Sequence, residues 1–108
     1  MVSTKSEVTE LLRANGKQIA SYGAKSLGLF GSFVRDQATS ESDVDFVVEF
    51  LPEKKNYDNF IQLSDFLENL LGRKVELVTN SSISKYLKPH IDKSIEYVAL
   101  GLWITSTY

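Results

Sequence analysis

The chain has 108 residues, 43% of them hydrophobic, which is enough for one small core and too little for two. Lys and Arg number 12 against 14 Asp and Glu, so the formal net charge is −2 and no general positive field is available for nucleic acids or anionic membranes. The chain contains no cysteine and one histidine, which excludes disulfides, thiolate zinc sites and His-rich clusters. No apolar run approaches the ~20 residues that span a bilayer, and the N-terminus lacks a signal peptide's apolar region. We expect one cytoplasmic domain over residues 1–108.

The first quarter of the chain predicts a helix followed by a strand. Thr4 and Glu7 fit a capping box, and apolar residues recur behind them at helical spacing, so we expect a helix over residues 4–21 that Gly23 ends. The apolar run over residues 26–30 is too short for a helix and contains glycine, which favours a buried strand.

Side chains alternate in character along residues 43–50, which predicts a second strand with a fixed register. A short helix over residues 33–37 is expected before it. The side chains that would face the core are Val44, Phe46, Val48 and Phe50. The opposite face carries carboxylates, so it must look toward solvent or an open cleft.

The second half of the chain predicts two helices and one more strand. Apolar residues at helical spacing indicate a helix over residues 57–71 that Gly72 closes, and residues 74–79 read as a strand. A helical C-terminal region follows, in which Pro89 suits the first turn of a helix that reaches about Ala99. The fold class is therefore α/β of the α+β kind, a small mixed sheet backed by helices.

Two aspartates at the start of the second strand carry the most information. Asp43 and Asp45 lie on one face of that strand, where their like charges repel unless a cation sits between them. Taken alone, the pair is also compatible with a solvated strand end. Glu76, flanked by apolar residues in the third strand, would complete a set of oxygen ligands that suits Mg²⁺.

A Gly-Ser turn precedes these carboxylates. Gly31 and Ser32 follow the first strand, at a position where a helix is expected to begin. Glycine permits close approach of the backbone, and the free N–H groups at the start of a helix bind anions. A phosphate group could dock at this turn, although a Gly-Ser pair by itself is more typical of an ordinary loop.

The combined pattern is more specific than its parts. Residues 31–35 read GSFVR and, after a spacer, residues 42–48 read SDVDFVV. This arrangement resembles the DNA polymerase β-type nucleotidyltransferase superfamily, specifically the minimal nucleotidyltransferases encoded beside HEPN-domain proteins. The resemblance covers about residues 27–78 and implies a single minimal nucleotidyltransferase domain with a fold like the polymerase β palm.

The resemblance implies a role for each residue of the pattern. Gly31 and Ser32 would hold the phosphates of a nucleoside triphosphate. Asp43 and Asp45 would bridge Mg²⁺ to the triphosphate. Glu76 would hold a second Mg²⁺ and help to deprotonate the acceptor hydroxyl.

One residue of the pattern has two interpretations, and two others differ from the family's usual residues. Arg35 would steady a phosphate or the aspartate strand, or instead form a surface ion pair with Asp36 or Glu41. The family usually places Asp where this chain has Glu76, which is one methylene longer. It also usually has Gly after the arginine, where this chain has Asp36.

The function implied is transfer of AMP from ATP to a hydroxyl, with a tyrosine of a HEPN-type toxin as acceptor and two Mg²⁺ ions as cofactors. The protein would then be the antitoxin of a toxin–antitoxin pair and form a hetero-oligomer with its partner. One alternative is an antitoxin that neutralises the toxin by binding alone. Another is nucleotidyl transfer to a small molecule such as an antibiotic, for which an additional domain is usual.

Overall fold

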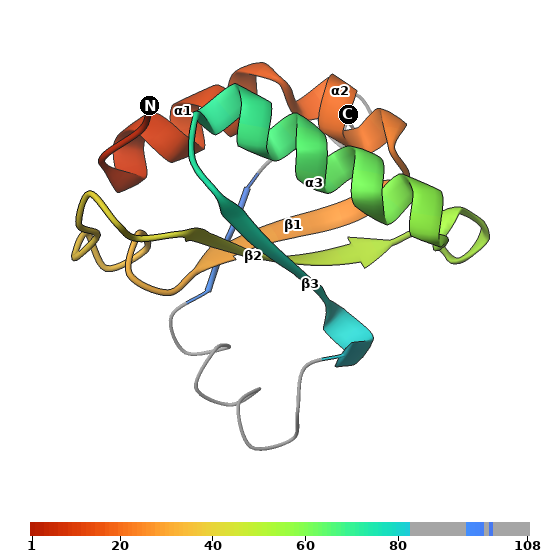
Figure 1. Cartoon of the computed structure of the whole chain (residues 1–108). Coiled ribbons are helices and arrows are strands. Elements are labelled where there is room, and N and C mark those ends of the chain that lie inside the picture. The colour runs from red at the N-terminus through yellow and green to blue at the C-terminus, as the bar shows by residue number, and fades with distance from the viewer. Residues whose placement is uncertain (83–94, 99, 101–108) are drawn as a thin grey trace.

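The computed structural model describes residues 1–82, 95–98 and 100. In this part of the chain, helices cover one face of a four-stranded sheet (Figure 1). The elements are α1 (Lys5–Ala14), α2 (Gly16–Ser21), β1 (Ala24–Phe30), β2 (Val44–Phe50), η1 (Pro52–Lys54), α3 (Tyr57–Leu71), β3 (Val75–Thr79), η2 (Asn80–Ser82) and β4 (Glu96–Tyr97). The predicted fold class, a small mixed sheet backed by helices, is confirmed.

The sheet has the strand order β3-β2-β1-β4. β1 runs antiparallel to both of its neighbours, whereas β2 and β3 are parallel and are joined through α3. The register places Asp45 between Phe30 of β1 and Glu76 of β3. The carboxylates of β2 and β3 therefore reach the same row of the sheet, because paired residues in a sheet share a face.

The core lies between the helices and one face of the sheet. β2 buries the side chains predicted for it, and they pack with β1 and with the inner faces of α1 and α3. The fully buried side chains include Val8, Leu12, Leu27, Leu29, Val44, Phe46, Val48, Leu63 and Leu67. Because the apolar face of β2 is committed to this core, its aspartates must face the other way.

α3 has the bounds that the sequence predicts, and both of its ends are capped. The Asn56 side chain accepts a hydrogen bond from the backbone N–H of Asn59 at 2.8 Å, which satisfies a free donor of the first turn. Gly72 ends the helix in the left-handed conformation, with φ of 69°.

The N-terminal helix is not continuous, so the prediction of one helix over residues 4–21 is wrong. Its capping box is present, but the helix breaks at Asn15, whose side-chain amide donates to the Leu11 carbonyl at 2.8 Å. A Cβ atom on Gly16 would also run into the backbone of Leu100. The chain thus bends at a polar residue and a glycine, where α2 can approach Leu100 closely.

Residues 33–37 form turns rather than the predicted helix. The N–H of Asp36 donates to the Phe33 carbonyl at 3.1 Å, and the N–H of Gln37 donates to the Ser32 carbonyl at 2.8 Å. Asp36 is left-handed, with φ of 53°. This pair of bonds is the closing arrangement of a helix C-terminus, so the segment ends within a single turn.

The prediction of a final helix to Ala99 is wrong over its last residues. Glu96 and Tyr97 form β4, which pairs with Gly28 and Leu29 of β1. A Cβ atom on Gly28 would meet side-chain atoms of Ile95 at 2.5 to 2.7 Å, so the glycine makes room for this strand. The rest of that predicted helix, and the tail, lie outside the described residues.

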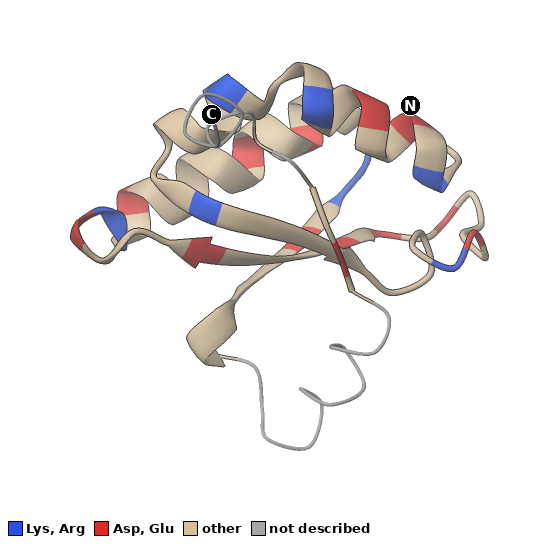
Figure 2. Cartoon of the chain, turned by 180° about the vertical axis from the view of Figure 1, so that it is seen from behind, with Lys and Arg blue, Asp and Glu red and all other residues tan. Residues whose placement is uncertain are grey.

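The described helices do not include one long and apolar enough to cross a membrane. Seen from the opposite side, the described helices and loops carry both basic and acidic segments (Figure 2).

Candidate active site

Three carboxylates lie on the face of the sheet that the described helices do not cover. Asp45 and Glu76 are direct partners across the parallel pair β2 and β3. Asp43 lies two residues before Asp45, so period-two geometry gives it the same face. Asp43 and Asp45 are partly buried and Glu76 is exposed. The sequence-predicted carboxylates are therefore neighbours in space.

The Gly-Ser turn lies directly against this group. Gly31 follows β1 with φ of 79°, a conformation that favours glycine. A Cβ atom there would lie 3.1 Å from Cγ of Asp45 and would overlap its Oδ2. Only a glycine lets the backbone pass this close to the carboxylate, which brings the predicted phosphate site and the predicted metal ligands into contact.

The negative charges of these carboxylates repel one another, as their positions in the sequence predict. The pKa of Asp45 is raised to about 6 by burial, by the charge of Glu76 and a hydrogen bond with it, and by the charge of Asp43. Arg35 opposes this shift, which places its positive charge within range of Asp45. Net repulsion among carboxylates is the condition under which a bound cation is favourable.

Arg35 makes neither of the ion pairs considered as alternatives. Its Nε donates to the Gln37 side chain at 3.3 Å, and the two ion pairs of the described residues are Lys5 with Glu96 and Lys25 with Glu49. The exposed guanidinium thus remains available beside the Gly-Ser turn.

Asp36, which stands where the resemblance leads one to expect glycine, has a structural partner. Its Oδ1 accepts a hydrogen bond from the backbone N–H of Lys5 at 2.9 Å. Lys5 is the first residue of α1, so this bond satisfies a free donor of that helix and favours a negative charge there. The carboxylate is therefore directed toward α1, and its hydrogen bond holds the turn that contains Asp36 against that helix.

Arg73 is a residue of the site region that the sequence does not single out. The residue is 9% exposed, and its Nη1 donates to the carbonyls of Ser42 at 2.8 Å and Thr39 at 3.0 Å. Charged residues are assigned to the surface by default, so sequence patterns do not reveal such a burial. Its position between the cap Gly72 and a buried strand is the one available signal.

The donor chemistry of the site fits a hard cation. Carboxylate oxygens are what Mg²⁺ prefers, and it commonly uses one or two of them while water and phosphate supply the rest. Within residues 1–82, 95–98 and 100, no group of three or more acidic or histidine side chains is close enough to hold a metal by itself. Carboxylates of this kind fit a cation that also takes oxygen ligands from phosphate and water.

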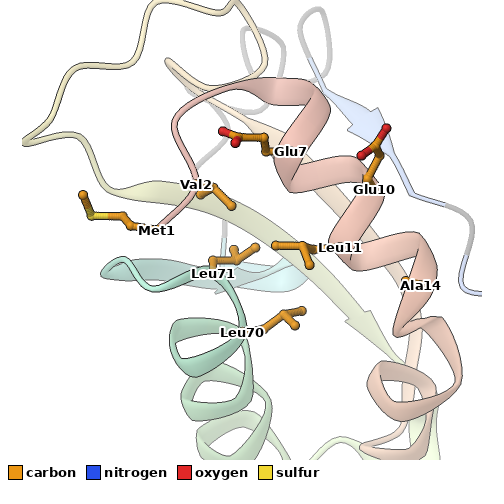
Figure 3. Close-up of a pocket in the computed structure, with 8 residues that line it drawn as sticks. All are labelled: Met1, Val2, Glu7, Glu10, Leu11, Ala14, Leu70 and Leu71. Carbon is orange, nitrogen blue, oxygen red and sulfur yellow. The ribbon is translucent and has the colours of Figure 1, made fainter.

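A separate cavity lies in the helical layer and does not belong to this site. It has a volume of about 490 Å³ and lies between α1 and the end of α3 (Figure 3). Leu11, Leu70 and Leu71 line it, together with Glu7. The Glu7 carboxylate is already occupied, since it accepts from the N–H of Ser3 at 2.7 Å, and this bond contributes most to lowering its pKa.

A Gly-Ser turn against acidic residues of a mixed sheet is the arrangement that the resemblance to nucleotidyltransferases implies. The chain belongs to the nucleotidyltransferase domain family, whose model matches residues 8–99.

Relatives and solved structures agree with this assignment. A "putative protein adenylyltransferase" of Methanocaldococcus jannaschii is 41% identical over 90% of this chain and 100% of its own length. The protein adenylyltransferase MntA of Thermococcus cleftensis is 36% identical over 88% of this chain and 96% of its own. The structure of a "putative minimal nucleotidyltransferase" is 28% identical, with a TM-score of 0.69 over 82% of this chain and 93% of its own.

A fourth match shows the fold alone. It is the structure of a tri-AMPylated Shewanella oneidensis HEPN toxin in complex with an MNT antitoxin. The matched chain is 22% identical, with a TM-score of 0.53 over 86% of this chain and 66% of its own.

Proposed function

We propose that this protein transfers AMP from ATP to a hydroxyl group of a partner protein. The observation that carries the proposal is the contact between Gly31 and the carboxylate of Asp45. It joins a backbone that can approach phosphate to acidic residues that can hold the cation of a nucleoside triphosphate. The names of the relatives, protein adenylyltransferases, support the choice of AMP as the transferred group.

The chemistry divides among the predicted site residues. Gly31 and Ser32 hold the β- and γ-phosphates through backbone N–H groups and the serine hydroxyl, and Arg35 offsets phosphate charge. The acceptor oxygen attacks the α-phosphorus. The bond between the α-phosphorus and the oxygen that bridges the α- and β-phosphates breaks. Pyrophosphate leaves, and Glu76 takes the proton of the acceptor hydroxyl.

Asp43, Asp45 and Glu76 would hold two Mg²⁺ ions in this proposal. Bound Mg²⁺ would neutralise the charge that develops on the phosphates. The carboxylates must then be ionised, and binding a cation at Asp45 favours its charged form over the protonated form that burial and neighbouring negative charge favour.

The acceptor is proposed to be a tyrosine hydroxyl of a HEPN-type toxin, so that the protein acts as an antitoxin within a hetero-oligomer. The sequence suggests this partner through its resemblance, and the AMPylated HEPN toxin bound to an MNT antitoxin is a precedent of the same fold.

The alternative, an antitoxin that acts by binding alone, draws on two features of the site. Glu76 is longer than the aspartate usual in the family, and the described carboxylates do not form a three-ligand group by themselves. A misplaced third carboxylate would weaken the geometry that an octahedral ion requires.

Glu76 provides the deciding experiment. The protein is incubated with α-labelled ATP, Mg²⁺ and the HEPN-type protein encoded beside it, and transferred label is measured. Glu76→Gln should lower transfer about 10²- to 10⁴-fold, the usual weight of a general base, while Glu76→Asp retains or improves it. Glu49→Gln is the matched control, because Glu49 is an exposed glutamate on the same face of β2 as Asp45, at the other end of the strand, where it pairs with Lys25 at 3.9 Å.

Toxin neutralisation is measured with the same variants. Loss of transfer together with loss of neutralisation in Glu76→Gln supports catalysis as the means of neutralisation. Neutralisation at wild-type strength by a Glu76→Gln variant that no longer transfers label supports the binding alternative and overturns the proposal that the toxin is neutralised by AMP transfer. Absence of transfer by the wild-type protein overturns the proposed activity itself.

A further inference from the structure

Arg73 is a buried cation without an acidic partner in the described part of the chain. Both ion pairs found there involve other residues. Its positive charge is instead surrounded by carbonyl oxygens: Nε donates to Val2 at 2.7 Å, and Nη1 donates to Ser42 at 2.8 Å and Thr39 at 3.0 Å. A buried charge is costly unless its donors are satisfied, so these bonds must persist in the folded state.

The guanidinium also stacks near the Gly-Ser turn. Its Cζ lies 5.1 Å from the centroid of the Phe33 ring, which is fully buried and follows Ser32 in sequence. One side chain therefore fixes the loop that leads into Asp43 and the turn that carries the predicted phosphate site.

Hydrogen bonds to Arg73 and Lys74 hold the backbone on both sides of Asp43. The Ser42 carbonyl accepts from Arg73, and the N–H of Val44 donates to the Lys74 carbonyl at 3.0 Å. Ser42 and Val44, which precede and follow Asp43, are thus hydrogen-bonded to Arg73 and Lys74 respectively. The same segment continues into β3 and carries Glu76 two residues beyond Lys74. These two hydrogen bonds set the separation between β2, which begins directly after Asp43, and β3, which carries Glu76.

We propose that Arg73 is a positioning residue, which holds Asp43, Glu76 and the Gly-Ser turn at the spacing that nucleotidyl transfer requires. This inference rests on the proposed function of the site. Arg73 does not touch the nucleotide; it acts through the carbonyls of the 39–42 loop and through Phe33. A shift of about 1 Å in such a group can cost about 10²-fold in rate.

The role requires arginine rather than any cation. Nε and Nη1 bond to separate segments of the chain, and the planar guanidinium stacks on an aromatic ring. A lysine has one ammonium group and cannot span both segments. Arg73→Lys therefore keeps the positive charge but loses the paired donors Nε and Nη1. Arg73→Met keeps most of the volume of the aliphatic part of the side chain and loses both the charge and the paired donors.

The test compares these variants with two controls. Arg13→Lys makes the same exchange at an exposed position, and Leu63→Ala removes fully buried core volume, which sets the effect of instability alone. Each protein is assayed well below its melting temperature for AMP transfer and for the rise in melting temperature caused by ATP with Mn²⁺.

We expect Arg73→Lys and Arg73→Met to lower kcat about 10- to 100-fold and to raise the Mn²⁺ concentration for half-maximal transfer, with the KM for ATP changed less. Arg13→Lys and Leu63→Ala should match wild type in both. Wild-type kcat and Mn²⁺ dependence in Arg73→Lys would overturn the positioning role, and so would losses no greater than those of Leu63→Ala.

Failure of the proposed function gives a different pattern. A wild-type protein that transfers no AMP but is stabilised by ATP with Mn²⁺ overturns the transfer proposal. Loss of that stabilisation in Arg73→Lys, and its retention in Arg13→Lys, would then still support the positioning role. A wild-type protein without transfer and without stabilisation overturns both.

Discussion

The two faces of β2 are built from one strand, yet they follow opposite rules. The face toward the helices is apolar, and Val44, Phe46 and Val48 on it are fully buried. The opposite face places Asp45 beside Glu76 and against Gly31, with its pKa raised by burial and like charge. The first face stabilises the fold, whereas the second spends part of that stability on a site whose charges are balanced only when a cation binds.

The largest expected effect is on the core face. Phe46→Ala removes a fully buried ring between the sheet and the helices and should lower the free energy of unfolding by about 3–5 kcal/mol. Urea denaturation with a structural probe measures it. A loss below about 1 kcal/mol would mean that the core does not depend on this face of β2.

The next effect combines stability with binding. Gly31→Ala places a side chain at a left-handed position and against the Asp45 carboxylate, so we expect a loss of about 1–3 kcal/mol in stability. The stabilisation of the protein by ATP with Mg²⁺ should disappear as well. Thermal melts with and without nucleotide test both, and undiminished stabilisation in the variant would place the triphosphate elsewhere.

The third effect is a gain and depends on pH. The pKa of Asp45 is raised to about 6, so its protonated form stabilises the native state below the unfolded pKa, and this contribution is lost as the pH rises through about 6. Asp45→Asn should melt at the same temperature as wild type near pH 4 and above it near pH 7.5, without metal. Equal melting temperatures at both values would contradict the raised pKa.

The smallest effect concerns Asp36. Asp36→Gly relieves a left-handed aspartate but removes the hydrogen bond to the N–H of Lys5, so the two changes should cancel to within about 0.5 kcal/mol. Asp36→Ala loses the bond and keeps the strain, and it should be about 1 kcal/mol less stable than Asp36→Gly. Denaturant titrations of the three proteins measure the difference.

Predictability differed between elements with local signals and elements without them. α3 has the predicted bounds because a capping asparagine, a helical apolar stripe and a terminal glycine all lie within its own sequence. The helix predicted over residues 4–21 breaks at Asn15, and the next residue, Gly16, packs against the backbone of Leu100, which lies far along the chain. The helix predicted to end near Ala99 gives way to β4 because Gly28 leaves room beside it.

By itself, the sequence determined the alternation of β2, the grouping of its aspartates on one face and the spacing that resembles a nucleotidyltransferase. These features depend on side-chain order along a single strand and turn, where geometry follows directly from period two. Only the tertiary structure decided that Asp45 faces Glu76 across parallel strands, that Asp36 accepts a hydrogen bond from the first residue of α1 and that Arg73 is buried among carbonyl groups. Each of these depends on contacts between segments that are distant in the chain, and a residue's own sequence neighbours do not specify such contacts.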